Sequence, residues 1–235
     1  MPRYTRRQLK QDKFAETAQG AAEWATGHRS AVVWGVSVLI AVVLITIGFV
    51  TWRSRQMERG NDELGAAMKT FDTPLRAPGT PAGDTPSFTS VAERAKAAEK
   101  QFKAIADKYS MVPPGKIARY MDGIALLQSG DTAGAEQQLK SASNSGDKDV
   151  AALAKMALAS IYRDSKRQAD AAKLYKELVE HPTNSVSKAT AQLELADMYE
   201  KTDPQQATAI YQQIQKDDPH SGAAQMATQK LQNKK

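Results

Sequence analysis

The second half of the sequence repeats one pattern of small and large residues about every 36 residues. Ala135, Ala171 and Ala207 recur at spacings of 36, and each is followed by a large residue four positions later and a small or aliphatic residue seven positions later. Residues at i, i+4 and i+7 lie on one face of an α-helix. A unit of this length holds two short helices, and it buries its apolar faces only against neighbouring units. The recurrence therefore predicts an all-α solenoid of helical hairpins.

A second series marks the first helix of each hairpin, with Gly123, Ala159 and Ala196 at spacings of 36 and 37. Between the two helices of each hairpin lie turn sequences that are expected to supply N-cap side chains: Gly130-Asp131, Asp164-Ser165 and Asp203-Pro204. The composition agrees, because 38 alanines and only 15 aromatic residues favour close-packed helices over a β-sandwich.

A further half-unit lies upstream. Ala98, Phe102 and Ile105 precede the next members of the same series by 37 residues, and Ser90 with Glu93 forms a capping-box pattern at the start of that helix. Its partner helix is expected at about residues 56–71. Residues 73–89, rich in proline, are expected to form a flexible insertion between the two helices, and residues 221–235 a capping helix or tail.

One segment is far more apolar than the rest. Residues 31–52 contain no charged side chain and are bracketed by Arg29 and Arg53. At about 1.5 Å per residue, a helix of this length reaches roughly 33 Å, which is enough to cross a hydrocarbon core of about 30 Å. The sequence therefore predicts a transmembrane signal anchor at residues 30–53.

The orientation of this anchor follows from the charges beside it. Residues 1–29 carry six basic and three acidic residues, which favours a cytoplasmic tail, although a count restricted to twenty residues on each side favours the reverse. We give the whole tail more weight, because long domains translocate largely regardless of flanking charge. The basic tail is suited to binding the anionic membrane surface. Residues 53–235 contain 26 basic and 23 acidic side chains, so they lack the concentrated basic face that nucleic-acid binding requires.

Enzymatic signatures are absent from the sequence. It contains no GxGxxG, GxxxxGK[ST], HExxH or GxSxG pattern and no cysteine. Its histidines, His28, His181 and His220, stand beside the apolar segment or next to prolines, where exposed turn residues are a better explanation than metal ligands. We therefore expect no enzyme, catalytic residue, cofactor, metal or small-molecule substrate.

The hairpin pattern resembles the tetratricopeptide repeat. The resemblance is carried by Leu158-Ala159-Ser160-Ile161-Tyr162 with Ala171, and by Leu195-Ala196-Asp197-Met198-Tyr199 with Ala207. About four repeats would occupy residues 54–220. The sequence departs from the family's pattern at Asp122, which replaces an apolar residue, and at Arg119, Lys155 and Gln192, which fill the usual tryptophan position.

The resemblance implies a concave, protein-binding groove lined by the first helix of each repeat. The family's groove positions fall on Ile117, Tyr120, Ile124, Leu127, Met156, Ser160, Arg163, Leu193, Asp197 and Glu200. Such a groove would run from apolar to acidic; for Ile117 and Leu193, packing between repeats is an equally good alternative. The Lys/Asn clamp of some family members is absent, since Tyr120 and Ile124 stand in its place.

The layout of a basic tail, one anchor and a small repeat domain with a proline-rich insertion is similar to the family of ancillary subunits of the bacterial Sec translocon. That resemblance implies an inner-membrane adaptor whose periplasmic domain acts with the translocon and a membrane-anchored peptidyl-prolyl isomerase-like chaperone on exported envelope proteins. Two alternatives stay open: a scaffold that coordinates envelope constriction during division, as in a neighbouring family, and a structural protein that assembles with itself.

Overall fold

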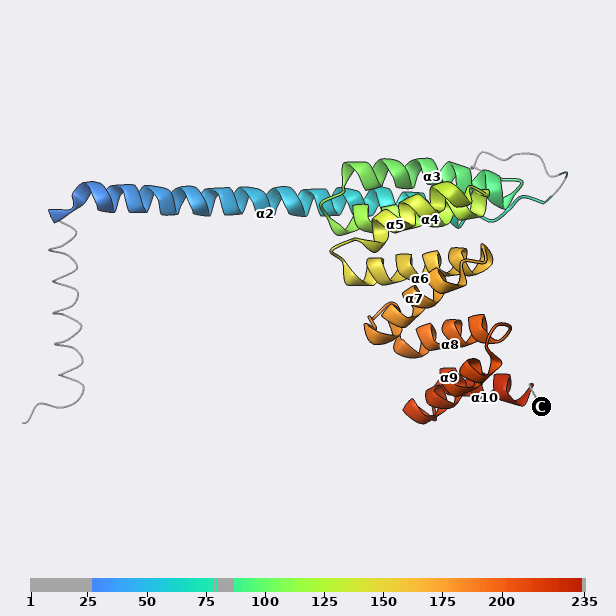
Figure 1. The fold of residues 1–235 in the computed structure, drawn as a ribbon. Helices are drawn as coiled ribbons and strands as arrows, with labels where there is room; N and C mark the ends of the chain where they lie inside the picture. Colours follow the sequence, from blue (N-terminus) through green and yellow to red (C-terminus); the bar gives the residue numbers. More distant parts are fainter. Residues whose placement is uncertain (1–26, 78, 80–86, 234–235) are drawn as a thin grey trace, which may run out of the picture. The chain divides into compact units, whose positions relative to one another are not determined.

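The computed structural model describes residues 27–77, 79 and 87–233, and within these ranges the regular structure is helical (Figure 1). The helices are α2 (Arg29–Phe71), α3 (Val91–Lys108), α4 (Pro113–Ser129), α5 (Thr132–Ser143), α6 (Lys148–Asp164), α7 (Gln168–Glu180), α8 (Lys188–Tyr199), α9 (Pro204–Asp217) and α10 (Gly222–Gln232). From α3 onward each helix packs against the next. The predicted all-α solenoid of helical hairpins is confirmed.

The chain divides into two compact units, Met1–Arg55 and Gln56–Lys235. The described part of the first unit is the apolar half of α2, which is long and apolar enough to cross a membrane. The hydroxyls of Thr46 and Thr51 donate hydrogen bonds to backbone carbonyls one turn earlier in the same helix, at 2.8 and 2.9 Å. These two hydroxyls are therefore satisfied within the helix, as a membrane span requires of its polar groups.

The anchor expected at residues 30–53 and the helix expected at about residues 56–71 lie on one continuous helix, α2, which runs from Arg29 to Phe71. The intervening residues contain no proline that would end the helix. Later in the same helix, position 60 requires a small residue, because a Cβ on Gly60 would lie 3.0 Å from the Pro114 Cβ.

The second unit, residues 56–235, stacks helical hairpins. The pairs α4/α5, α6/α7 and α8/α9 are complete hairpins, the end of α2 precedes α3, and α10 follows α9. The small residues of the two sequence series lie at the crossings: Ala135, Ala159, Ala171, Ala196 and Ala207 are all 0% exposed. At the α4/α5 crossing only glycine fits, because a Cβ on Gly123 would lie 2.6 Å from the Leu139 Cγ.

The caps agree with the sequence in most places and differ in one. Ser90, Asp131, Asp203 and Ser221 each accept a hydrogen bond from a backbone N–H in the first turn of the following helix. The expected cap at Asp164-Ser165 is wrong, because α6 extends through Asp164 and α7 begins only at Gln168 with no side-chain cap.

Arg167 occupies the N-cap position of α7, but its side chain makes tertiary contacts and does not cap the helix. The guanidinium donates to both carboxylate oxygens of Glu136, at 3.1 and 2.6 Å, and its Cζ lies 4.0 Å from the centre of the Tyr162 ring. These contacts join α5, α6 and α7. A tertiary contact has therefore replaced a local cap at this turn.

The described ends of the proline-rich insertion are fastened to the repeat domain. Leu75 and Phe88 form an isolated bridge, and the Arg76 N–H donates to the Phe88 carbonyl at 2.8 Å. The Glu93 carboxylate accepts from the backbone and hydroxyl of Thr89, both at 2.8 Å, which completes the capping box one residue earlier than expected. Residues 78 and 80–86, where flexibility was expected, lie outside the described residues, as do residues 1–26 of the basic tail and residues 234–235.

Asp122 is a buried carboxyl group in the repeat domain. It is 1% exposed, and its Oδ1 has no hydrogen-bond partner among the residues that the structure describes. Burial, helped by the negative charge of Glu99, raises the pKa of Asp122 to about 6. A group whose pKa is higher in the folded chain stabilises the fold when protonated, and that contribution is lost as the pH rises through the folded pKa.

We therefore predict that Asp122→Asn removes a pH-dependent loss of stability. The free energy of unfolding of the natural chain should fall as the pH rises from about 4 to 7, whereas that of the variant should stay nearly level over this step. At pH 8 the variant should be more stable by about 2–3 kcal/mol. Denaturant unfolding of both chains across this pH range measures the difference. If the free energies of unfolding of the two chains change with pH in the same way, Asp122 does not have a raised pKa in the folded chain.

Candidate functional site

The ten positions that the resemblance assigns to a groove all lie on α4, α6, α8 or the residue that follows α8. None of the ten is buried: Ile117 and Asp197 are exposed and the other eight are partly exposed. Helix α4 contacts α6 directly, and α8 contacts α10. The first helices of successive hairpins therefore offer accessible side chains at these positions.

The structure brings four of these residues together around one hollow. A cavity of about 300 Å³ is lined by Tyr120, Met156, Ser160 and Arg163, and also by Leu153, Ala157, Tyr175 and Glu194. Its apolar wall comes mainly from one face of α6, opposite the Tyr120 ring on α4. We call this cavity the α4/α6 hollow. It is a concave feature on the predicted groove face.

The other six predicted residues are not part of this hollow. Ile124 and Leu127 are half-buried against the central core, and Leu193 packs against the core cluster of the last hairpin, which includes Tyr211. Ile117 is 37% exposed near the start of α4. Packing between repeats, the alternative to groove lining for these two residues, therefore describes Leu193 better than Ile117.

Tyr175 is a residue of the hollow that the groove positions missed. It belongs to α7, the second helix of its hairpin, and the residue is 0% exposed to solvent. Tyr175 lines the hollow, and its buried hydroxyl has no hydrogen-bond partner within the described ranges. Burial raises the pKa of Tyr175 to about 12, so the group remains a neutral donor. A buried hydroxyl without a hydrogen-bond partner lowers the stability of the fold.

An ion pair stands beside Tyr175 and links two hairpins. Arg163 Nη1 donates to Glu194 Oε2 at 2.9 Å, and its Nη2 donates to the Ser160 hydroxyl at 3.1 Å. The Arg163 side chain is 30% exposed, so solvent screens the pair only in part. The contact fixes the polar rim of the hollow between α6 and α8.

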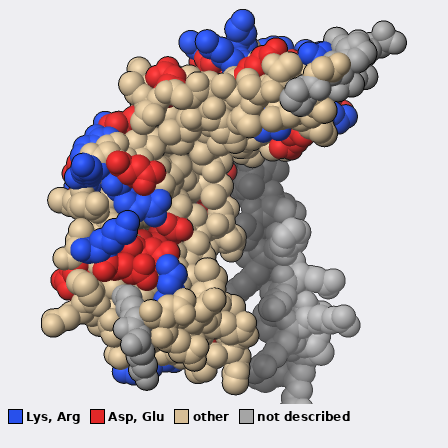
Figure 2. Space-filling model, turned by 90° about the vertical axis from the view of Figure 1, so that its right-hand side faces the viewer, with Lys and Arg blue, Asp and Glu red and all other residues tan. Residues whose placement is uncertain are grey.

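The acidic end of the predicted groove is occupied by the chain's own side chains. The Tyr211 hydroxyl donates to Asp197 and to Glu200, the latter at 2.9 Å, and the Lys230 ammonium from α10 lies 2.9 Å from Asp197 and 3.5 Å from Glu200. Figure 2 likewise shows basic and acidic side chains next to one another along one side of the face drawn. A basic residue of a partner would have to compete with Lys230 here.

No cluster of three or more His, Asp or Glu side chains that could hold a metal ion occurs within residues 27–77, 79 and 87–233.

Comparison with known proteins identifies one family. A family model described as a tetratricopeptide repeat-like domain matches residues 32–233, a range that includes both the apolar part of α2 and the helical hairpins. No curated protein and no solved structure shows a significant match to the chain. Domains of this kind are generally protein-interaction modules without catalytic activity.

The two core tyrosines give a matched test of whether the Tyr175 hydroxyl lacks a hydrogen-bond partner. Tyr175 and Tyr211 occupy equivalent positions 36 residues apart and both are 0% exposed, but only the Tyr211 hydroxyl is bonded to carboxylates. We predict that Tyr175→Phe leaves the free energy of unfolding unchanged or raises it by up to about 1 kcal/mol, whereas Tyr211→Phe lowers it by about 1–3 kcal/mol. Denaturant unfolding measures both, and equal losses would show that Tyr175 has an acceptor.

Proposed function

The chain belongs to the tetratricopeptide repeat-like domain family, and from this premise we propose that it is a membrane-anchored adaptor that binds a segment of another protein across α4 and α6. The observation that carries the proposal is the α4/α6 hollow, where the apolar side chains of Leu153, Met156 and Ala157 on α6 and the ring of Tyr120 on α4 line one accessible depression. An apolar side chain of a protein segment would fill this hollow.

The lining suits a range of protein segments. Met156 is an adaptable apolar contact, since its unbranched side chain can change shape with its ligand. The Tyr120 ring on the facing helix provides a rigid aromatic surface of the kind that dominates protein interfaces. The Arg163–Glu194 pair at the rim adds little affinity in solvent but restricts which charges can approach. These contacts favour binding of varied clients over one fixed ligand.

We propose further that the adaptor works in the bacterial inner membrane beside the Sec translocon. In this arrangement residues 1–29 are cytoplasmic, residues 30–53 form the anchor, and residues 54–220, closed by the helix that follows, lie in the periplasm. The layout of basic tail, single apolar helix and repeats supports this assignment by its resemblance to the ancillary translocon subunits. The partners would be the translocon, exported envelope proteins and a membrane-anchored peptidyl-prolyl isomerase-like chaperone.

The proposed orientation makes a direct prediction. A protease added to intact spheroplasts should digest residues 53–235 and leave an N-terminal fragment that includes the anchor, because the repeat domain faces outward. Immunoblots with tags at each end of the chain distinguish the products. Digestion of the N-terminal tail alone would reverse the orientation.

Binding in the α4/α6 hollow is tested by crosslinking in living cells. A photo-reactive amino acid at Ser160, inside the hollow, should crosslink to translocon subunits or to exported envelope proteins, whereas the same probe at the exposed Lys173 on α7 should not. Adding Tyr120→Ala should reduce the Ser160 product about tenfold or more, because truncation of an interface anchor commonly costs about 2 kcal/mol.

One control and two further outcomes complete the experiment. Thermal unfolding followed by circular dichroism must show that Tyr120→Ala leaves the fold intact. Equal products from Ser160 and Lys173 would contradict the proposed site. Products that contain only a second copy of the chain would favour the self-assembling scaffold instead.

A further inference from the structure

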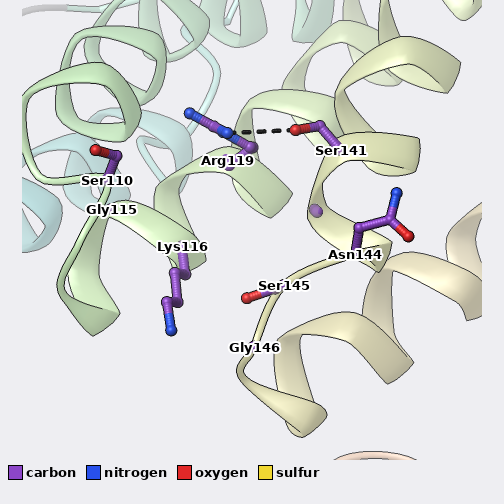
Figure 3. A pocket seen from close by; sticks show the side chains of 9 residues that line it. Ser110, Gly115, Lys116, Arg119, Ser141, Asn144, Ser145 and Gly146 are labelled. Atoms are coloured by element: carbon purple, nitrogen blue, oxygen red, sulfur yellow. Dashed lines mark hydrogen bonds between the residues drawn. The ribbon is translucent and has the colours of Figure 1, made fainter.

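A second hollow, separate from the α4/α6 hollow, lies where the α3–α4 turn meets the α5–α6 turn (Figure 3). It measures about 220 Å³, and its polar lining consists of Ser110, Lys116, Arg119, Ser141, Asn144 and Ser145. We call it the Lys116/Arg119 pocket. It shares no lining residue with the α4/α6 hollow.

The charge of this pocket is positive and poorly compensated. No Asp or Glu is among its lining residues, and Lys116 has no ion-pair partner in the described part of the chain. Arg119 forms an ion pair with Asp107 at 3.9 Å, although the Asp107 side chain is 70% exposed, and the Arg119 Nη2 also donates to the Ala106 carbonyl at 3.5 Å. An exposed pair at that distance is weak, so both cations remain available to a ligand.

The uncharged groups of the pocket also present donors. The Ser141 hydroxyl accepts from Arg119 Nη1 at 3.3 Å, and the Ser145 hydroxyl accepts from the Asp147 N–H at 3.1 Å. Neither hydroxyl proton has an acceptor among the described residues, and the Ser110 hydroxyl has no partner there at all. Asn144 differs, since its amide already donates to the Lys140 carbonyl at 3.0 Å. The pocket therefore holds an excess of donors over acceptors.

The backbone holds these groups in place before any ligand arrives. A Cβ on Gly115 would lie 2.1 Å from the Tyr109 carbonyl oxygen, so the α3–α4 turn is packed directly against the start of α4. On the opposite wall a Cβ on Gly146 would lie 3.8 Å from Lys116 Nζ, which places the ammonium group beside the α5–α6 turn. Figure 3 shows Lys116 and Arg119 on one wall facing Ser141, Asn144 and Ser145 on the other.

We propose that the Lys116/Arg119 pocket binds an oxyanion group, either a carboxylate or a phosphate. Such a group accepts several hydrogen bonds at once and carries the charge that the two cations lack, and charge-assisted hydrogen bonds are about twice as strong as neutral ones. The geminal oxygens of either anion can reach a lysine, an arginine and serine hydroxyls from one position. The pocket would give the adaptor a second contact that is independent of the α4/α6 hollow.

The test uses the full chain in maltoside micelles, with inorganic phosphate as the probe. The phosphorus-31 resonance of phosphate should broaden on addition of protein at constant ionic strength, with chloride as the competing anion. The double variant Lys116→Gln/Arg119→Gln should weaken binding about tenfold or more, because it removes both charged donors. Lys173→Gln/Lys176→Gln removes the same charge from exposed positions of α7 and should bind phosphate as the natural chain does.

Two hexapeptides of alanine and serine, one with a free C-terminal carboxylate and one amidated, identify the source of the anion. Displacement of phosphate by the free carboxylate alone indicates a protein C-terminus, and no displacement by either peptide indicates a phosphate ligand. Equal broadening with both double variants, or complete suppression by chloride, would overturn the proposal. Circular dichroism checks folding, and the single variant Lys116→Gln, which breaks no hydrogen bond or ion pair of the described residues, serves if the double variant unfolds.

Discussion

The close crossing of the two helices within each hairpin sets the geometry of the whole repeat domain. At these crossings the chain has either no side chain, as at Gly123, or a single methyl group, as at Ala159 and Ala171, and these alanines are fully buried. Larger residues would separate the helices, and overpacking of this kind typically costs about 1–3 kcal/mol. Because the crossings recur at a constant interval, successive hairpins stack in the same way. The accessible face of α4 and α6, and the hollow between them, follow from that stacking.

The fold could be predicted from the sequence wherever it depends on local pattern. The period of small and large residues determined the hairpins, and Asp131 and Asp203 could be recognised as caps because N-capping depends only on nearby residues. Helix α2 continues to Phe71 because nothing in its sequence stops it, and Gly60 leaves room for Pro114 beside it. The missing cap of α7 has a tertiary cause. Arg167 replaces the expected cap because it binds Glu136 on another helix, a contact that no local rule predicts.

The candidate site was predictable in outline and not in detail. The resemblance selected positions that are all accessible, and four of them, including Tyr120 and Ser160, surround one hollow. It did not select Tyr175, because a tyrosine in a core series looks like packing until its hydroxyl is seen to lack an acceptor. Nor could the period show that Lys230 approaches Asp197, since that contact depends on where the last helix docks. The sequence can therefore predict which helix face is accessible, but it cannot predict which side chains pair between repeats.

The account rests on the claim that a protein segment binds across the first helices of the hairpins. Hydrogen–deuterium exchange of the full chain, alone and with a translocation-arrested envelope precursor, tests this claim most directly because it reports on each helix separately. The account predicts slower exchange in α4 around Tyr120 and in α6 around Met156 when the precursor is present, with α5 and α7 unchanged. Protection confined to α5 and α7, or none in any helix of the repeat domain, would contradict it.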